Sequence, residues 1–342
     1  MTLITNGNIE NYLIQKKLLS KKERAEITLL QGGNVNTIFR IRIKAKKAKK
    51  KEKTREFVLK QTLEEPLNKK MFLKPIKLSM DRNYYEVKTM ETIHALLSAP
   101  HVPEILFTDP ANFVIGMTAA PEYAKLHQQE CFEGKFHFDI AYELGKFTAE
   151  IHSRTFQNKE IEKMFSESPG LDLRAITIVS AFEKYPKYKK KFQEAFEKSR
   201  KNKLCLVDAD ITQKNILLHN ETFTKLDFET VHYGDPALDV GILLAHYFLF
   251  AIRYPQWKKE YLHCAALYWQ AYEQNCTFSL PKKYFENMKN YCVLMMLGRI
   301  DSDVVLTWLE GYHEKVRQLA LGIFDKKINR IPELLSFVEK TI

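Results

Sequence analysis

The sequence predicts an α+β protein with two lobes, a small N-terminal lobe rich in antiparallel β-strands and a larger, mainly helical C-terminal lobe. Short β-rich segments separated by turn residues dominate the first third of the chain. Apolar residues then recur at helical spacing over most of the remainder. Since 342 residues leave room for two lobes, we expect parts at 1–120 and 121–342, joined by a hinge at 118–123. A cleft between two lobes is a usual place for a ligand.

In the N-terminal part, turn residues separate short segments that are rich in β-branched and aromatic residues, and these segments are the expected strands. Gly32-Gly33-Asn34 separates the first two segments, and residues 109–112 separate the last two. The strands are expected at 27–30, 37–43, 56–61, 104–107 and 113–118, and the helices at 8–18 and 82–97.

The C-terminal part is expected to consist of helices interrupted once by short strands. The expected helices are 138–154, 174–200, 236–252, 256–274, 282–299, 303–323 and 332–341. The expected strands are 204–207, 215–218 and 223–227, with a hairpin turn at His219-Asn220.

Composition narrows the class of protein. With 45% hydrophobic and 28% charged residues, the chain is typical of a soluble globular protein. The five scattered cysteines lack metal-binding spacing, which predicts reduced thiols and a cytoplasmic location. The N-terminus has no signal-peptide pattern, and the longest apolar run, 240–252, is too short to span a bilayer. We therefore expect no membrane span.

The net charge of +11 raises nucleic acid as an alternative partner. Much of the excess lies in two clusters, residues 40–55 and 184–203, and neither has the aromatic and glycine pattern of an RNA-binding motif. A solvated hairpin tip and a solvated helix face are the simpler interpretations, so nucleic acid is the less favoured partner.

Polar side chains gather where the short strands end. The strand 204–207 leads into Asp208-Ala209-Asp210, Asn215 follows, and the next strand pair ends at Asp227-Phe228-Glu229. Carboxylate and amide oxygens suit a hard divalent cation. A further carboxylate beside them can accept a hydroxyl proton.

These residues and the downstream GDPALDVG segment (234–241) resemble the kinase-like small-molecule phosphotransferases, which include aminoglycoside phosphotransferases, choline/ethanolamine kinases and methylthioribose kinase. The resemblance covers about residues 25–310. It implies a two-lobed protein-kinase-like fold, with ATP and Mg²⁺ used to phosphorylate a hydroxyl of a small molecule.

The resemblance also implies roles for single residues. Asp210 would be the catalytic base, and Asn215 and Asp227 would be Mg²⁺ ligands. Glu229 gives the Asp-x-Glu form of choline kinase and methylthioribose kinase, in which the glutamate assists a metal; a solvated or salt-bridged glutamate is the alternative.

For the nucleotide, the resemblance implies that Lys60 neutralises phosphate oxygens. Its glutamate partner is expected to be Glu86, with Glu91 as the second choice. Gly32, Gly33 and Asn34 stand at the turn that would cover the phosphates, and residues 115–120 would face adenine.

Three further residues stand out in the C-terminal part. Asp239 is expected to brace the loop around Asp210 through backbone N–H groups, and His152 to be a packed or capping histidine. Arg299 either faces the acceptor site or makes a surface ion pair.

One residue departs from the family pattern, because Asp208 stands where a histidine is usual. We expect Asp208 either to raise the pKa of Asp210 by like-charge repulsion or to be neutralised by a lysine, with Lys214 as one candidate. The departure motivates the alternative of a catalytically impaired or regulatory kinase-like protein that binds nucleotide.

The spacing also bears on the acceptor. Only residues 228–238 separate Asp227 from Asp239, which leaves little room for the segment that holds a peptide in protein kinases. A small-molecule alcohol is therefore favoured. Sugars, amino alcohols and aminoglycosides all remain open as acceptors, as does the oligomeric state.

Overall fold

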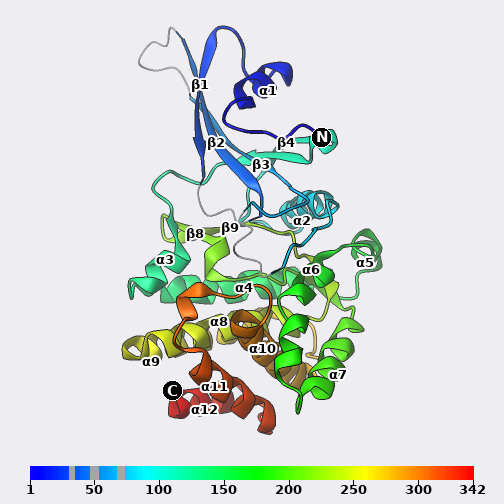
Figure 1. The fold of residues 1–342 in the computed structure, drawn as a ribbon, viewed down its shortest axis with the longest axis vertical. Coiled ribbons are helices and arrows are strands. Elements are labelled where there is room, and N and C mark those ends of the chain that lie inside the picture. Colours follow the sequence, from blue (N-terminus) through cyan, green and yellow to red (C-terminus); the bar gives the residue numbers. More distant parts are fainter. Residues whose placement is uncertain (31–34, 47–53, 68–73) are drawn as a thin grey trace.

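The computed structural model describes residues 1–30, 35–46, 54–67 and 74–342. A β-sheet near the N-terminus stands over a larger body of helices, with the C-terminus at the opposite end (Figure 1). This arrangement confirms the predicted α+β architecture. The division at residue 120 stays a prediction.

The N-terminal sheet is antiparallel and has five strands in the order β1-β2-β3-β5-β4. All five strands predicted from the sequence are present. They are β1 (Glu23–Leu29), β2 (Thr37–Ala45), β3 (Arg55–Gln61), β4 (Ile105–Asp109) and β5 (Val114–Thr118).

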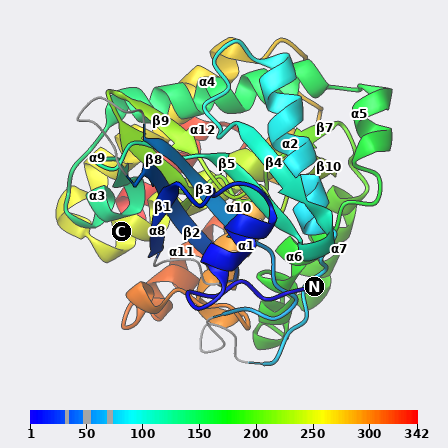
Figure 2. The same ribbon diagram turned by 90° about the horizontal axis from the view of Figure 1, so that it is seen from above.

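The two faces of this sheet have different partners, because side chains alternate along each strand. On β3, Phe57 and Leu59 join a buried cluster with the first helix, α1 (Ile9–Gln15). Lys60 belongs to the opposite set and reaches Glu86 on helix α2 (Arg82–Leu96). Seen from above, α1 lies over the sheet (Figure 2).

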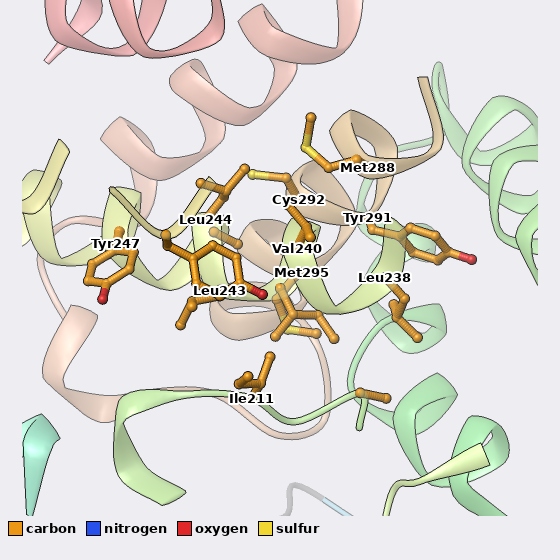
Figure 3. Close-up of a cluster of buried hydrophobic side chains, with 14 of the residues drawn as sticks. Ile211, Leu238, Val240, Leu243, Leu244, Tyr247, Met288, Tyr291, Cys292 and Met295 are labelled. Carbon is orange, nitrogen blue, oxygen red and sulfur yellow. The ribbon is translucent and has the colours of Figure 1, made fainter. Parts of the chain in front are cut away.

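The helical part is built around α8, whose residues from Ala237 to Ile252 are all buried. Side chains of α8, such as Val240 and Leu243, pack against Cys292 and Met295 of α10 (Figure 3). The helices are α3 (His127–Phe132), α4 (Phe138–Thr155), α5 (Lys159–Met164), α6 (Gly170–Ile176), α7 (Lys189–Arg200), α8 (Ala237–Arg253), α9 (Lys258–Asn275), α10 (Tyr284–Asp301), α11 (His313–Asp325) and α12 (Ile331–Thr341).

Two predicted helices are wrong in extent. The segment 174–200 contains the end of α6, a 3-10 turn at Val179–Lys184 and then α7. Pro186 lies in the break, and proline disfavours helical backbone at the residue before it. The helix predicted at 303–323 begins only at His313, after Gly311 with φ of 83°.

Short strands lie between the sheet and the helices (Figure 1). Strand β7 (Cys205–Val207) pairs with β10 (His232–Gly234). Strands β6 (Lys125–Leu126), β8 (Ile216–His219) and β9 (Thr222–Lys225) form a second small sheet in the order β6-β8-β9. The β8–β9 turn uses two left-handed residues, Asn220 and Glu221, which is one residue further along the chain than the predicted turn.

Within the described ranges, no single helix combines the length and apolar character needed to cross a membrane. Helix α8 and the segment 255–275 reach that length and apolar composition only when the two are taken together, and the chain bends by 120° between them.

Candidate functional site

The loop after β7 carries Asp208 and Asp210, and Asp239 of helix α8 holds its backbone through hydrogen bonds. Oδ2 of Asp239 accepts a hydrogen bond of 2.9 Å from the backbone N–H of Asp208, and its Oδ1 accepts one of 2.6 Å from that of Ala209. Ala209 has a left-handed φ of 58°, so these bonds fix an unusual backbone. Ile211 anchors the other side of the loop in the buried cluster (Figure 3).

Asp239 is itself oriented by a histidine. Nε2 of His152 lies 3.0 Å from Oδ2 of Asp239, and both side chains are buried. Asp239 therefore braces the loop and His152 is a packed histidine, as the sequence predicts.

The Asp210 carboxylate is buried and surrounded by donors. The amide of Asn215 donates a hydrogen bond of 2.8 Å to Oδ2, and Nζ of Lys214 lies 2.8 Å from the same oxygen. Nη2 of Arg174 lies 2.7 Å from Oδ1, and Nη2 of Arg299 lies 3.6 Å from it. Burial opposes ionisation, but the three cations hold the pKa of Asp210 well below its usual value.

Asp208 has a separate partner. Nζ of Lys225, a fully buried residue at the end of β9, lies 2.7 Å from Oδ2 of Asp208. The expectation that a lysine neutralises Asp208 is confirmed, but the lysine is Lys225. The candidate Lys214 is wrong, because Lys214 pairs with Asp210. The alternative expectation, a raised pKa of Asp210, is also wrong, because its neighbouring cations outweigh the charge of Asp208.

A second polar cluster centres on Lys60. Its Nζ lies 2.8 Å from Glu86, 2.8 Å from Asp227 and 3.2 Å from Glu229. Burial alone would lower the pKa of the Lys60 ammonium, but the surrounding carboxylates raise it well above the usual value. The predicted Lys60–Glu86 pair is therefore present, whereas Glu91 pairs with Lys88 on the exposed side of α2.

Glu86 and Glu229 connect the elements around this cluster. Glu86 also accepts a hydrogen bond of 3.3 Å from the backbone N–H of Phe228, which ties α2 to the loop after β9. Glu229 accepts a hydrogen bond from Asn36, and its Oε2 lies 3.3 Å from Nε of the buried Arg82. Glu229 is therefore paired with Lys60 and Arg82, and its role beside a metal stays a prediction.

The structure brings the predicted residues into two adjacent groups. Asp210 and Asn215 form one group, and Lys60, Glu86, Asp227 and Glu229 form the other. Lys214, which pairs with Asp210 at 2.8 Å, also lowers the pKa of Asp227 through its charge, although burial opposes that shift. The predicted phosphate-covering residues Gly32, Gly33 and Asn34 lie outside the described residues.

Sequence reasoning missed Lys225 and Arg174. Lys225 had a signal, because it shares the inward face of β9 with Phe223, and a charged residue at an inward position requires a partner. The sequence carries no signal for Arg174, because the segment 174–200 is predicted as one long helix and nothing in it indicates a contact with Asp210.

The sequence matches the model of a family described as the phosphotransferase enzyme family over residues 50–274. This match covers more than half of the chain, and the chain therefore belongs to that family. A search of curated proteins with the sequence found no match.

Several solved structures are similar to this chain at low sequence identity. A choline/ethanolamine kinase family protein from Mesorhizobium loti is 14% identical, with a TM-score of 0.55, and the match covers 98% of this chain and 100% of the other. A choline kinase from Cryptosporidium parvum is 10% identical, with a TM-score of 0.54 and coverage of 98% and 99%. An ADP-bound aminoglycoside phosphotransferase is 13% identical, with a TM-score of 0.49 and coverage of 98% and 98%. The first two confirm the predicted protein-kinase-like fold.

Proposed function

We propose that this member of the phosphotransferase enzyme family transfers the γ-phosphoryl group of ATP to a hydroxyl group of a small molecule. The observation that carries the proposal is the buried Lys60 ammonium, held by Glu86 of α2 and Asp227 of the loop after β9. This contact joins a buried cation of the N-terminal sheet to the loop that carries Asp227, which supports a role for Lys60 in binding the phosphates of ATP. The expected cytoplasmic location rests on the free cysteines at 131, 205, 264, 276 and 292.

In the proposed reaction, Asp210 receives the acceptor hydroxyl. Its carboxylate orients the oxygen toward the γ-phosphorus of ATP and takes the proton as the new O–P bond forms and the bond to ADP breaks. The low pKa of Asp210 keeps this carboxylate ionised. A weak base suffices, because a loose phosphoryl-transfer transition state draws most of its stabilisation from positioning and charge.

On the nucleotide side, Lys60 would contact the phosphates of ATP while Glu86 fixes the orientation of its side chain. The ammonium is rigid, because it stands on a central strand and contacts three carboxylates. Gly32, Gly33 and Asn34 remain predicted to cover the phosphates.

The chain also offers ligands for Mg²⁺. Carboxylate oxygens of Glu86, Asp227 and Glu229 lie within 4.8 Å of one another, a donor set that suits a hard cation. We propose Asp227, Glu229 and the amide oxygen of Asn215 as the ligands. When bound, Mg²⁺ would neutralise charge on the β- and γ-phosphates.

The test is transfer of label from γ-labelled ATP to compounds of a metabolite extract, catalysed by the purified protein. We expect a labelled product with the wild type and none with Asp210→Asn, while both proteins are stabilised thermally by Mg-ATP. Thermal stabilisation without transfer to any compound would instead support the regulatory alternative. The paired state of Asp208 removes the main reason for that alternative, because it leaves Asp210 ionised and oriented by Asn215.

A further inference from the structure

We propose that the phosphate acceptor carries an anionic group, a carboxylate or a phosphate, which binds to Arg174 and Arg299 beside Asp210. This inference rests on the proposed function and names the class of its acceptor. It also assigns to Arg299 the acceptor-facing position that the sequence left open.

The two arginines come from different helices and converge on one carboxylate. Arg174 lies on α6, Arg299 lies near the end of α10, and each residue is only 3% exposed. Their Nη2 atoms lie 2.7 Å and 3.6 Å from Oδ1 of Asp210. Any acceptor whose hydroxyl reaches Asp210 therefore comes within reach of both guanidinium groups.

The charges around Asp210 do not balance. Two buried guanidinium groups and the half-buried Lys214 surround a single carboxylate. The nearest acids along the chain have other partners, since Asp208 pairs with Lys225 and Asp172 pairs with Arg200. Asp301 lies near Arg299 in sequence and is paired with Arg317. The excess positive charge would be neutralised by an anionic ligand.

Both arginines have donors that make no hydrogen bond. Nε of Arg174 and Nε of Arg299 are buried without a hydrogen-bond partner among the described residues, and Nη2 of Arg299 has only the 3.6 Å ion pair with Asp210. Buried donors are rarely left unpaired in proteins. The planar guanidinium group matches the two oxygens of a carboxylate or a phosphate.

The arginines lie on the acceptor side of the site. The expected ATP-binding groups, Lys60 and Glu86, come from the N-terminal sheet and α2. The arginines come from α6 and α10 of the helical part instead (Figure 1). Lys214, which is paired with Asp210 at 2.8 Å, would serve the phosphoryl group during transfer.

The approach of the two helices is fixed by close backbone packing. A Cβ atom on Gly298, next to Arg299, would lie 2.0 Å from the carbonyl oxygen of Thr177. The Thr177 hydroxyl in turn lies 3.3 Å from Nη1 of Arg174. The positions of the two guanidinium groups are therefore coupled.

This charge pattern discriminates among the acceptors. An amino alcohol or an aminoglycoside would bring an ammonium group toward two buried guanidinium groups, and like-charge contact in a desolvated site is strongly unfavourable. A hydroxy acid or a phosphorylated alcohol would supply the missing acceptor oxygens.

The first experiment separates this inference from the proposed function. A metabolite extract is divided on an anion-exchange resin at alkaline pH, which retains compounds with a carboxylate or phosphate, and each fraction is incubated with the protein and γ-labelled ATP. We expect the main labelled product to form from the retained fraction. A main product from the unretained fraction would overturn the anionic acceptor and leave the phosphotransferase function intact. No transfer from either fraction would overturn both.

The second experiment uses the acceptor found in the retained fraction. Arg299→Gln is expected to raise the KM for that acceptor about 10- to 100-fold and to leave the KM for ATP unchanged. Arg299→Lys keeps the charge without the planar fork and should give a smaller increase. Arg330→Gln removes an exposed arginine that immediately precedes α12 and serves as the control. A fall in kcat with unchanged acceptor KM would show that Arg299 contacts the transferring phosphoryl group and would overturn the assignment.

Discussion

Nζ of Lys225 lies 2.7 Å from Oδ2 of Asp208, and the same ammonium donates hydrogen bonds of 2.8 Å and 3.3 Å to the backbone carbonyls of Leu226 and Asp227. One buried side chain therefore joins the loop that carries Asp210 to the loop that carries Asp227. The residue that departs from the family pattern is thus matched by a lysine on the neighbouring loop. We infer that this pair positions the two halves of the site relative to each other.

The first prediction concerns the stability of this pair. Lys225→Met removes the cation that opposes the raised pKa of Asp208, so the buried carboxyl group becomes protonated and unpaired, and we expect a loss of about 1–3 kcal/mol in the free energy of unfolding. Combining Lys225→Met with Asp208→Asn removes the unpaired acid and should recover part of the loss. Urea denaturation of the two single variants and the double variant measures the coupling.

The control for this cycle is an exposed pair. Lys88→Met breaks the contact with Glu91 on α2, and we expect a change of no more than about 0.5 kcal/mol. If the losses at Lys225 and Asp208 simply add, the pair does not act as a unit.

The second prediction is a pH dependence set by Asp208. Burial and two nearby aspartates raise its pKa to about 7, while Lys225 opposes the shift. Protonation below pH 7 removes the ion pair, so kcat should fall as pH decreases through about 7. The kcat–pH profiles of wild type and Asp208→Asn test this, because the variant has no such titration and should lose this acidic limb.

Stability should move in the opposite direction over the same range. The pKa of Asp208 in the folded protein lies above its ordinary value of 3.8, so the folded state binds this proton more tightly. Its contribution to stability is therefore present below pH 3.8 and is lost as pH rises to about 7. Relative to Asp208→Asn, the wild type should become less stable over this interval. An unchanged acidic limb in the variant would assign the limb to another group.

The sequence was sufficient for those parts of the site that depend on local pattern. Alternation along Phe57-Val58-Leu59-Lys60 separates the lysine from the core face of its strand, and the spacing from Asp210 to Asn215 places both residues on one loop. Asp239 was predictable for a similar reason, because an acid in the first turn of a buried helix has few partners other than backbone N–H groups.

The remaining features depend on packing between distant segments. The contact of Arg174 with Asp210 requires that α6 be a separate short helix, and the single long periodic pattern concealed the break before α7. The sequence suggests Lys214, which is near Asp208 in the chain, as only one candidate for its partner. The lysine that pairs with it comes from another strand, and single-sequence periodicity carries no information on which strands meet.

The third prediction distinguishes the two glutamates proposed as partners of Lys60. Glu86→Gln weakens the charge that orients the ammonium, and we expect kcat/KM for ATP to fall about tenfold or more, equivalent to at least about 1.4 kcal/mol. Glu91→Gln changes an exposed carboxylate on the same helix and should leave kcat/KM within about twofold of the wild type. Steady-state kinetics with varied ATP makes the comparison, and equal losses in both variants would contradict the assignment of Glu86.

The fourth prediction tests whether helix packing sets the arginine positions, using two glycines in helices. A Cβ on Gly298 of α10 would lie 2.0 Å from a backbone oxygen of Thr177, so Gly298→Ala must displace α10 or the segment after α6. We expect a loss of about 1–3 kcal/mol in the free energy of unfolding and a raised KM for the acceptor.

The control is a glycine with more room. A Cβ on Gly322 of α11 would meet only the far end of the Phe337 ring, at 3.1 Å. Because alanine also favours helix by about 1 kcal/mol, Gly322→Ala should change stability by less than about 1 kcal/mol and leave the KM unaltered. Thermal unfolding and acceptor titration of the two variants decide the matter: a destabilised Gly298→Ala protein with normal acceptor KM would show that the spacing of α6 and α10 does not govern the position of Arg299.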